Sequence, residues 1–235
     1  MKKQKIKIKG IPSIIWGEAS EFCVLAVHGS MSHKEDRIIE ILAAAAGSKG
    51  WQVLSFDLPQ HGERQGSDAL CKPQDCAADL KEIMAYAQTH WQQVQLFAVS
   101  LGAYFSLLAY PDEALKQALF LSPVVNMQHL LADMMQAAGV DSDNLKQRQI
   151  IPLDNGQTLY WDVYTYVNEH PIHTWPHPTM ILYAGHDYLV NKADILSFHQ
   201  KFPGKLTVYA EGEHFFHTPK QLQKAADWLS EMLKE

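Results

Sequence analysis

The fold of this chain is decided by the segment Leu96-Phe97-Ala98-Val99-Ser100-Leu101-Gly102-Ala103. A short apolar run there ends in small-x-Ser-x-Gly, and a helical pattern begins at once, which is the local signature of a nucleophile elbow. This tight strand-to-helix turn needs small residues two before and two after the serine, and Ala98 and Gly102 meet that need. A serine hydroxyl attacks a carbonyl only when a base takes its proton, so the segment predicts a histidine and an acid elsewhere in the chain.

Length and composition predict one ordinary globular domain. The chain has 235 residues, of which 47% are hydrophobic and 20% charged, and its formal net charge is −6. No apolar run approaches the length of a membrane-spanning helix, and no signal-peptide core follows the basic N-terminus, so we expect a cytoplasmic protein without a membrane span. Lysines at positions 2, 3, 5, 7 and 9 alternate with Ile6 and Ile8. This alternation favours a solvated edge strand over a basic arm for nucleic acid, and no nucleic-acid partner is expected.

The three cysteines indicate a reducing compartment. Cys23, Cys71 and Cys76 are odd in number and unevenly spaced, which argues against a disulfide framework. Cys23 lies in an apolar run, and we expect it to be buried. Cys71 and Cys76 lack the paired spacing of a zinc site.

Short apolar runs alternate with amphipathic stretches along most of the chain, which is typical of a mostly parallel sheet with helices on both faces. The predicted strands, eight in all, are residues 6–9, 11–16, 22–27, 53–57, 94–99, 118–121, 179–184 and 206–210. The first two have no helix between them and should pair antiparallel. Helices are predicted at 35–48, 73–90, 101–109, 192–202 and 219–233. In the last of these, Thr218 is the expected N-cap and Pro219 the first helical residue.

The alternation stops between Pro123 and Pro178, a stretch too long for an ordinary loop. We therefore predict an insertion at residues 123–177 and a core made of residues 1–122 and 178–235. Within the insertion, helices are expected at 127–138 and 163–169, with a hairpin in 149–162 around Asp154-Asn155-Gly156. An insertion that leaves the carboxyl edge of a parallel sheet lies over the place where such sheets bind ligands, so we interpret it as a cap.

Candidate partners for Ser100 follow two later strands. Asp187 comes after the strand at 179–184, and His214 comes after the strand at 206–210. All three side chains should therefore meet at one edge of the sheet as a catalytic triad. His217 is an alternative base, but His214 is nearer the strand end. Asp194 is an alternative acid, but it falls inside a predicted helix.

Nearly the whole chain resembles the α/β-hydrolase family, and several motifs carry the resemblance. The order serine, aspartate, histidine is the order of the family's triad. His28-Gly29-Ser30 resembles the family's oxyanion-loop motif, and the segment at 57–62 resembles D-x-x-G-H-G with Gln60 where glycine is usual. Ala98 likewise replaces the usual first glycine of the elbow.

The resemblance implies an α/β-hydrolase fold with an eight-stranded sheet and a small cap, and it implies that the backbone N–H groups of Ser30 and Leu101 form an oxyanion hole. The short capped members that act on esters look most similar. We therefore expect a serine hydrolase that cleaves a small-molecule carboxylic ester through an acyl-enzyme, without a cofactor. Alternatives on the same triad are a thioesterase, an amidase, a C–C hydrolase or an acyltransferase. A non-catalytic ligand-binding protein is a further alternative, and a homodimer is compatible with the sequence.

The substrate pocket is the least defined part of the prediction. His28, Met127, Trp161 and Tyr164 are its expected lining, although the residues of the insertion are equally compatible with a small core of the cap itself. Zinc accepts histidine ligands, and three histidines lie close together in the sequence at 170, 173 and 177. The prolines between them favour a connecting loop instead. No metal site is therefore predicted.

Overall fold

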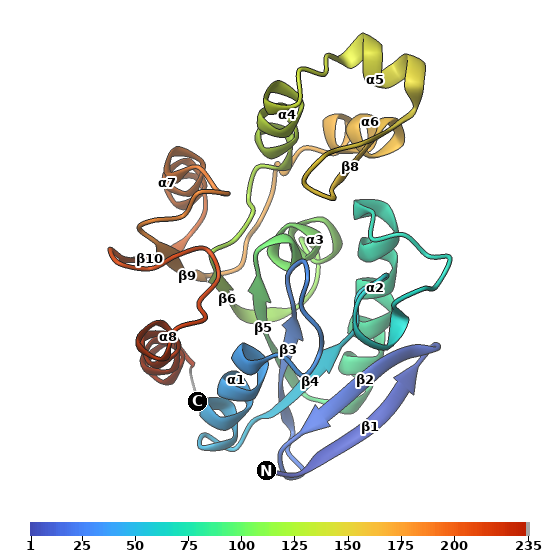
Figure 1. Ribbon diagram of the computed structural model, residues 1–235. Coiled ribbons are helices and arrows are strands. Elements are labelled where there is room, and N and C mark those ends of the chain that lie inside the picture. The colour runs from blue at the N-terminus through green and yellow to red at the C-terminus, as the bar shows by residue number, and fades with distance from the viewer. Residues whose placement is uncertain (234–235) are drawn as a thin grey trace.

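A mixed sheet of eight strands organises the protein. The computed structural model describes residues 1–233, so the last two residues of the predicted core, 234 and 235, lie outside the described part (Figure 1). The strands of the sheet are β1 (Lys3–Ile8), β2 (Ile11–Trp16), β3 (Phe22–Val27), β4 (Gln52–Phe56), β5 (Gln93–Val99), β6 (Leu115–Leu121), β9 (Thr179–Ala184) and β10 (Gly204–Tyr209). Their order is β1-β2-β4-β3-β5-β6-β9-β10. The predicted fold is confirmed.

Strand directions follow from the connections. β1 and β2 are joined by a tight turn at Lys9 and Gly10 and pair antiparallel, as predicted. β2 also runs antiparallel to β4, whereas the pairs from β4 through β10 are parallel. β1 lies at one edge of the sheet, and its lysines are exposed there, which is a common protection against edge-to-edge pairing.

Helices cover both faces of the sheet because successive side chains of a buried strand point to opposite sides. The helices of the core are α1 (Arg37–Gly47), α2 (Pro73–His90), α3 (Leu101–Ala109), α7 (Lys192–Lys201) and α8 (Pro219–Met232). Leu25 and Val27 of β3 belong to one hydrophobic cluster with α2, α3 and α7, while Val24 and Ala26 belong to a second cluster with α1 and α8. Within the described residues, no helix combines the length and the apolar character that a bilayer crossing needs.

Between β6 and β9 the chain forms α4 (Met127–Ala137), α5 (Ser142–Arg148), the two-stranded hairpin β7 (Ile150–Pro152) and β8 (Thr158–Tyr160), and α6 (Trp161–Glu169). In Figure 1 these elements lie together at the top of the view, beyond the ends of β5 and β6. Leu131, Leu145 and Val163 of this insertion belong to the same hydrophobic cluster as α2 and α3. The insertion therefore shares its interior with the sheet domain.

Candidate active site

Ser100 occupies a strained turn between β5 and α3. Its backbone has φ 50° and ψ −119°, a conformation that side chains other than glycine rarely adopt. The N–H of Ser100 donates to the carbonyl of Leu121, and its carbonyl accepts the N–H of Val124, each over 3.1 Å. Gly102 makes the turn possible, because a Cβ at this position would lie 2.4 Å from the carbonyl oxygen of His28. The end of β6 and the start of the insertion are thus both hydrogen-bonded to the Ser100 backbone.

The structure brings the three predicted triad residues together. Ser100 Oγ lies 2.9 Å from His214 Nε2, and His214 Nδ1 lies 2.8 Å from Asp187 Oδ2. The side chains of His214 and Asp187 are 1% and 0% exposed, so this pair is shielded from water. The second oxygen of Asp187 accepts the backbone N–H groups of Leu189 and Val190, each over 2.9 Å. A carboxylate only accepts, so Nδ1 donates to Asp187, and in this tautomer of the neutral ring Nε2 faces the serine hydroxyl as an acceptor.

Neither rival residue takes part in this arrangement. His217 is largely exposed and uses Nδ1 to bond the carbonyl of Phe215 over 2.7 Å. Asp194 lies on α7, where its two oxygens bond His129 and Asn126. The geometry therefore selects His214 and Asp187 from the alternatives that the sequence left open.

The predicted oxyanion loop, which follows β3, lies directly against the turn at Ser100. A Cβ on Gly29 would be 3.1 Å from the Cβ of Ser100 and 3.2 Å from the carbonyl oxygen of Val99, so only glycine fits without a shift. Among the hydrogen bonds of the described residues, none uses the N–H of Ser30 or of Leu101. Their predicted role as donors to an oxygen that develops negative charge stays a prediction.

The family described as serine aminopeptidase, S33, matches residues 18–169, which is more than half of the chain. The chain belongs to this α/β-hydrolase family. The matched range includes Ser100 and the loop at His28-Gly29-Ser30. It ends before Asp187 and His214, so the family match does not cover these two residues, and only the structure of this α/β hydrolase shows where they lie.

Solved structures share the fold across nearly the whole chain. Est1E from Butyrivibrio proteoclasticus with bound ferulic acid is 17% identical, with a TM-score of 0.78 over 97% of this chain and 96% of that one. Mouse alpha/beta hydrolase domain-containing protein 10 is 14% identical, with a TM-score of 0.76 over 99% and 98% of the two chains. An esterase from Pyrococcus furiosus is 15% identical, with a TM-score of 0.69 over 98% and 88%. Comparison with curated proteins found no match.

His28 does not serve as the pocket residue that the sequence suggested. Its ring is 1% exposed, Nδ1 donates to the carbonyl of Gly29 over 2.7 Å, and Nε2 accepts the N–H of Leu58 over 3.0 Å. Both nitrogens are thus used inside the α/β hydrolase and none is left for a ligand. Burial is the main cause that lowers the pKa of His28 to about 4. The neutral ring therefore links the loop after β3 to the segment after β4 through two hydrogen bonds.

A buried ion pair, which was not predicted from the sequence, connects the same two segments, the one after β3 and the one after β4. Lys34 Nζ lies 2.6 Å from Asp57 Oδ2 and 2.8 Å from Glu63 Oε1. Asp57 also accepts the backbone N–H groups of Lys34 and Glu63, each over 2.9 Å. Burial alone would raise the pKa of Asp57, but these hydrogen bonds outweigh it and hold the pKa below its usual range. The D-x-x-Q-H-G segment is therefore structural in this α/β hydrolase.

The other three expected pocket residues lie on the insertion. Trp161 and Tyr164 stack on each other on α6, with ring centroids 5.4 Å apart, and pack against the core cluster. Met127 lines a small cavity of about 30 Å³ together with Tyr104 of α3. Their contact with a substrate stays a prediction.

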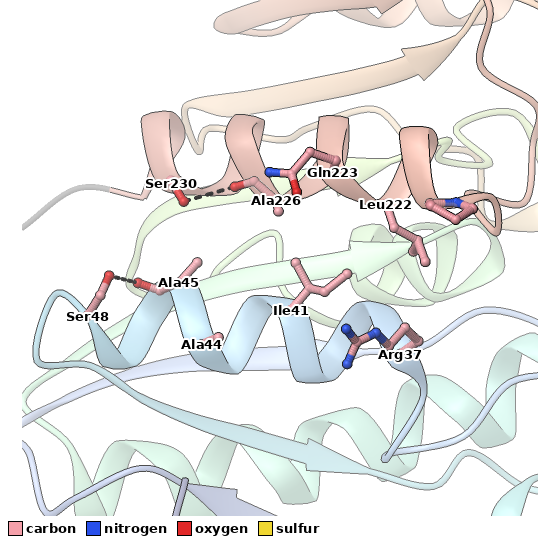
Figure 2. A pocket seen from close by; sticks show the side chains of 10 residues that line it. Arg37, Ile41, Ala44, Ala45, Ser48, Leu222, Gln223, Ala226 and Ser230 are labelled. Atoms are coloured by element: carbon pink, nitrogen blue, oxygen red, sulfur yellow. Dashed lines mark hydrogen bonds between the residues drawn. The ribbon is translucent and has the colours of Figure 1, made fainter.

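A separate groove of about 620 Å³ runs between α1 and α8 (Figure 2). Ile41 and Ala45 of α1 lie across it from Leu222 and Ala226 of α8. No triad residue lines this groove, which lies on the α1 and α8 face of the sheet. It is therefore distinct from the site at Ser100.

The histidine-rich segment before β9 forms no helix or strand. His170 Nδ1 bonds the carbonyl of Tyr166 over 2.8 Å, and His177 Nε2 bonds the carbonyl of Tyr110 over 2.9 Å. Within residues 1–233, no group of three or more His, Cys, Asp or Glu side chains is arranged to hold a metal ion. These two rings satisfy backbone carbonyls where the insertion rejoins the sheet.

Proposed function

We propose that this α/β hydrolase cleaves carboxylic esters through an acyl-enzyme formed on Ser100. The observation that supports this best is the continuous hydrogen-bonded path from Ser100 Oγ through His214 to Asp187, with distances of 2.9 and 2.8 Å. Such a path lets a neutral imidazole take the hydroxyl proton during attack and return it to the leaving group. No cofactor is needed for either step.

In the first half-reaction, Ser100 Oγ attacks the ester carbonyl while its proton moves to His214 Nε2. Asp187 stabilises the resulting imidazolium and is itself held by the N–H groups of Leu189 and Val190. The N–H groups of Ser30 and Leu101 bind the tetrahedral oxyanion, a contribution that reaches about 3 to 4 kcal/mol per donor in other serine hydrolases. The proton on His214 then passes to the departing alcohol. Water repeats the sequence on the acyl-enzyme, with His214 again as the base.

Two features favour an ester of a small-molecule or acyl-chain substrate. Among the structural relatives, the Pyrococcus furiosus protein is an esterase, and Est1E binds ferulic acid. The aromatic pair Trp161 and Tyr164 on α6 offers an apolar surface on the insertion. The family description names a serine aminopeptidase, so a peptide or amide substrate is the outcome that the experiment must distinguish.

The test combines labelling with a substrate panel. A fluorophosphonate probe should label the folded protein at Ser100 and should fail on Ser100→Ala, while Ser230→Ala, which changes an exposed serine of α8, should label normally. p-Nitrophenyl esters of increasing chain length, acyl-CoA thioesters and amino-acid p-nitroanilides should then be compared. We expect turnover of the esters, with a loss of several orders of magnitude in Ser100→Ala. Absence of labelling would favour a ligand-binding protein, and faster turnover of anilides than of esters would contradict the ester assignment.

A further inference from the structure

Two thiols meet at the N-terminus of α2, and neither belongs to the predicted triad. Lys72 is the N-cap of this helix and Pro73 its first residue, so Cys71 and Cys76 occupy the two positions whose side chains pack together as a hydrophobic staple. Their Sγ atoms are 3.5 Å apart. We propose that Cys71 and Cys76 form an oxidisable dithiol, in which Cys71 reacts with a peroxide and Cys76 closes a reversible disulfide.

Burial divides the roles between the two thiols. Cys71 is half-buried, whereas Cys76 is fully buried, so only Cys71 is open to a dissolved oxidant. The hydrogen bond with Cys76 is the largest cause that lowers the pKa of Cys71 to about 6, and His61 and Arg64 add to it against the effect of burial. Burial raises the pKa of Cys76. Cys71 therefore carries the thiolate, which is the nucleophilic form, and Cys76 keeps its proton.

The chemistry balances with a peroxide as the oxidant. The Cys71 thiolate attacks one peroxide oxygen, the O–O bond breaks, and the second oxygen leaves as hydroxide, which takes up a proton to become water. Cys71 is then a sulfenic acid. Cys76 sulfur attacks the Cys71 sulfur, the S–O bond breaks, and the departing hydroxide takes the Cys76 proton to give a second water. Two thiols lose two electrons in total, and the peroxide is reduced to water.

Closure requires only a small movement. A disulfide has an S–S distance of about 2.05 Å, so the two sulfurs must approach by about 1.5 Å from their present separation. Cys76 is fixed in the second turn of α2, but Cys71 lies outside the helix, at the end of the irregular segment 65–71. The cysteine that reacts first is thus the one outside the helix.

The reactive thiol lies next to the residues that position the oxyanion loop. The His61 ring accepts the N–H of Met31, the residue after Ser30, over 3.1 Å. The N–H of Cys71 donates to the side chain of Gln60 over 3.0 Å, which links the cysteine to the same segment. A disulfide draws Cys71 toward Cys76 and so alters its interaction with His61. As a consequence that rests on the proposed ester hydrolysis, we expect slower turnover in the oxidised form.

The decisive experiment follows the mass of one peptide. Trypsin leaves residues 65–81 intact, because Lys72 precedes Pro73, so both thiols lie in one fragment. The reduced full-length protein is treated with hydrogen peroxide, and the remaining thiols are blocked with iodoacetamide. We expect this fragment to become about 2 Da lighter and resistant to the alkylating agent, and dithiothreitol should restore both thiols.

Three variants complete the test. Cys76→Ser should stop at the sulfenic acid, which dimedone traps on Cys71, and Cys71→Ser should not react. Cys23→Ser is the matched control and should behave as the wild type, because Cys23 is buried at 0% exposure. The proposal is wrong if the fragment keeps two alkylated thiols after peroxide treatment, or if Cys23 is oxidised as fast as Cys71.

Ester hydrolysis provides a separate readout. The oxidised wild type should turn over p-nitrophenyl esters several-fold more slowly and recover with dithiothreitol, while the double variant Cys71→Ser/Cys76→Ser should be insensitive to peroxide. An unchanged rate in fully disulfide-bonded protein would disprove the link to the oxyanion loop. Because the mass readout needs no substrate, a failure of the proposed ester activity would leave the test of the dithiol intact.

Discussion

The ammonium of Lys34 and the carboxylate of Asp57 form an ion pair that is almost fully withdrawn from water. Their Nζ and Oδ2 atoms are 2.6 Å apart, and the two side chains are 4% and 0% exposed. Lys34 lies four residues after Ser30, and Asp57 follows β4 directly. The pair therefore connects the segment after the predicted oxyanion loop to the end of β4. Its loss should lower both the free energy of unfolding and the rate of turnover.

Removing one partner of this pair should strongly destabilise the protein. In Lys34→Met, the Asp57 carboxylate stays buried without its cation, a situation that typically costs about 3 to 5 kcal/mol. Chemical denaturation measures the free energy of unfolding directly. The control is Lys220→Met, which removes an exposed, solvent-screened ion pair with Glu211 and should leave the free energy of unfolding nearly unchanged. Equal effects of the two substitutions would contradict the assignment of Lys34 as a buried brace.

Acid should weaken the fold through His28. In the folded protein the pKa of His28 is lowered from 6.5 to about 4. Between these two pH values the imidazole is protonated in the unfolded chain but stays neutral in the folded protein. The free energy of unfolding is therefore unaffected by His28 above pH 6.5, and it falls by at most about 3 kcal/mol as the pH drops from 6.5 toward 4. His28→Gln should flatten the dependence of the unfolding free energy on pH within this window. His173→Gln, at an exposed position, should leave the slope unchanged.

The elbow should not tolerate a methyl group at Gly102. In Gly102→Ala, the new Cβ would lie 2.4 Å from the carbonyl oxygen of His28 and 2.8 Å from that of Val27, both of them backbone atoms. We expect a loss of several kcal/mol in stability, or a displaced oxyanion loop with little remaining activity. Gly47→Ala meets no atom within 4 Å and should be neutral or slightly stabilising. Thermal denaturation and ester turnover of the two variants, measured side by side, give the comparison.

Paired substitutions should separate the triad from its neighbours. Asp187→Asn should lower kcat by about four orders of magnitude while the protein stays folded, because the amide favours the wrong tautomer of the imidazole. Asp194→Asn, on α7, should retain nearly full turnover. In the same way His214→Ala should be inactive and His217→Ala active. A strong loss in Asp194→Asn or His217→Ala would show that the geometry at Ser100 does not describe the working site.

The sheet could be predicted from the sequence because its strands are buried apolar runs. The bounds of β2, β3 and β9 agree with the prediction, and the antiparallel pairing of β1 with β2 is confirmed. β1 begins three residues earlier than expected, because its pairing with β2 extends to Lys3 and Trp16. The polar residues at the start of β1 gave no apolar pattern from which this extension could be predicted. The helix α5 was missed because Leu145 is its one buried residue, which leaves no periodic pattern to detect.

The convergence of Ser100, Asp187 and His214 could be predicted because each residue follows its own strand, and strand ends meet at one edge of a parallel sheet. His28 was misjudged because its two backbone partners, Gly29 and Leu58, are known only from the fold. Lys34 was missed because lysine is almost never fully buried, and no local pattern reveals a partner 23 residues away. The Cys71 and Cys76 pair did leave a signal, since the helix start at Pro73 places them at staple positions.

The carbonyl of Ser100 accepts the N–H of Val124, so the first residues of the insertion are hydrogen-bonded to the proposed nucleophile itself. This attachment limits how the segment can be exchanged in chimaeras. A graft that begins at residue 123 would replace the residue that donates to the Ser100 carbonyl, and a poor fit there would displace the Ser100 hydroxyl whatever the new segment binds. A graft that begins after Val124 keeps that hydrogen bond and lets substrate preference be varied independently of the catalytic geometry.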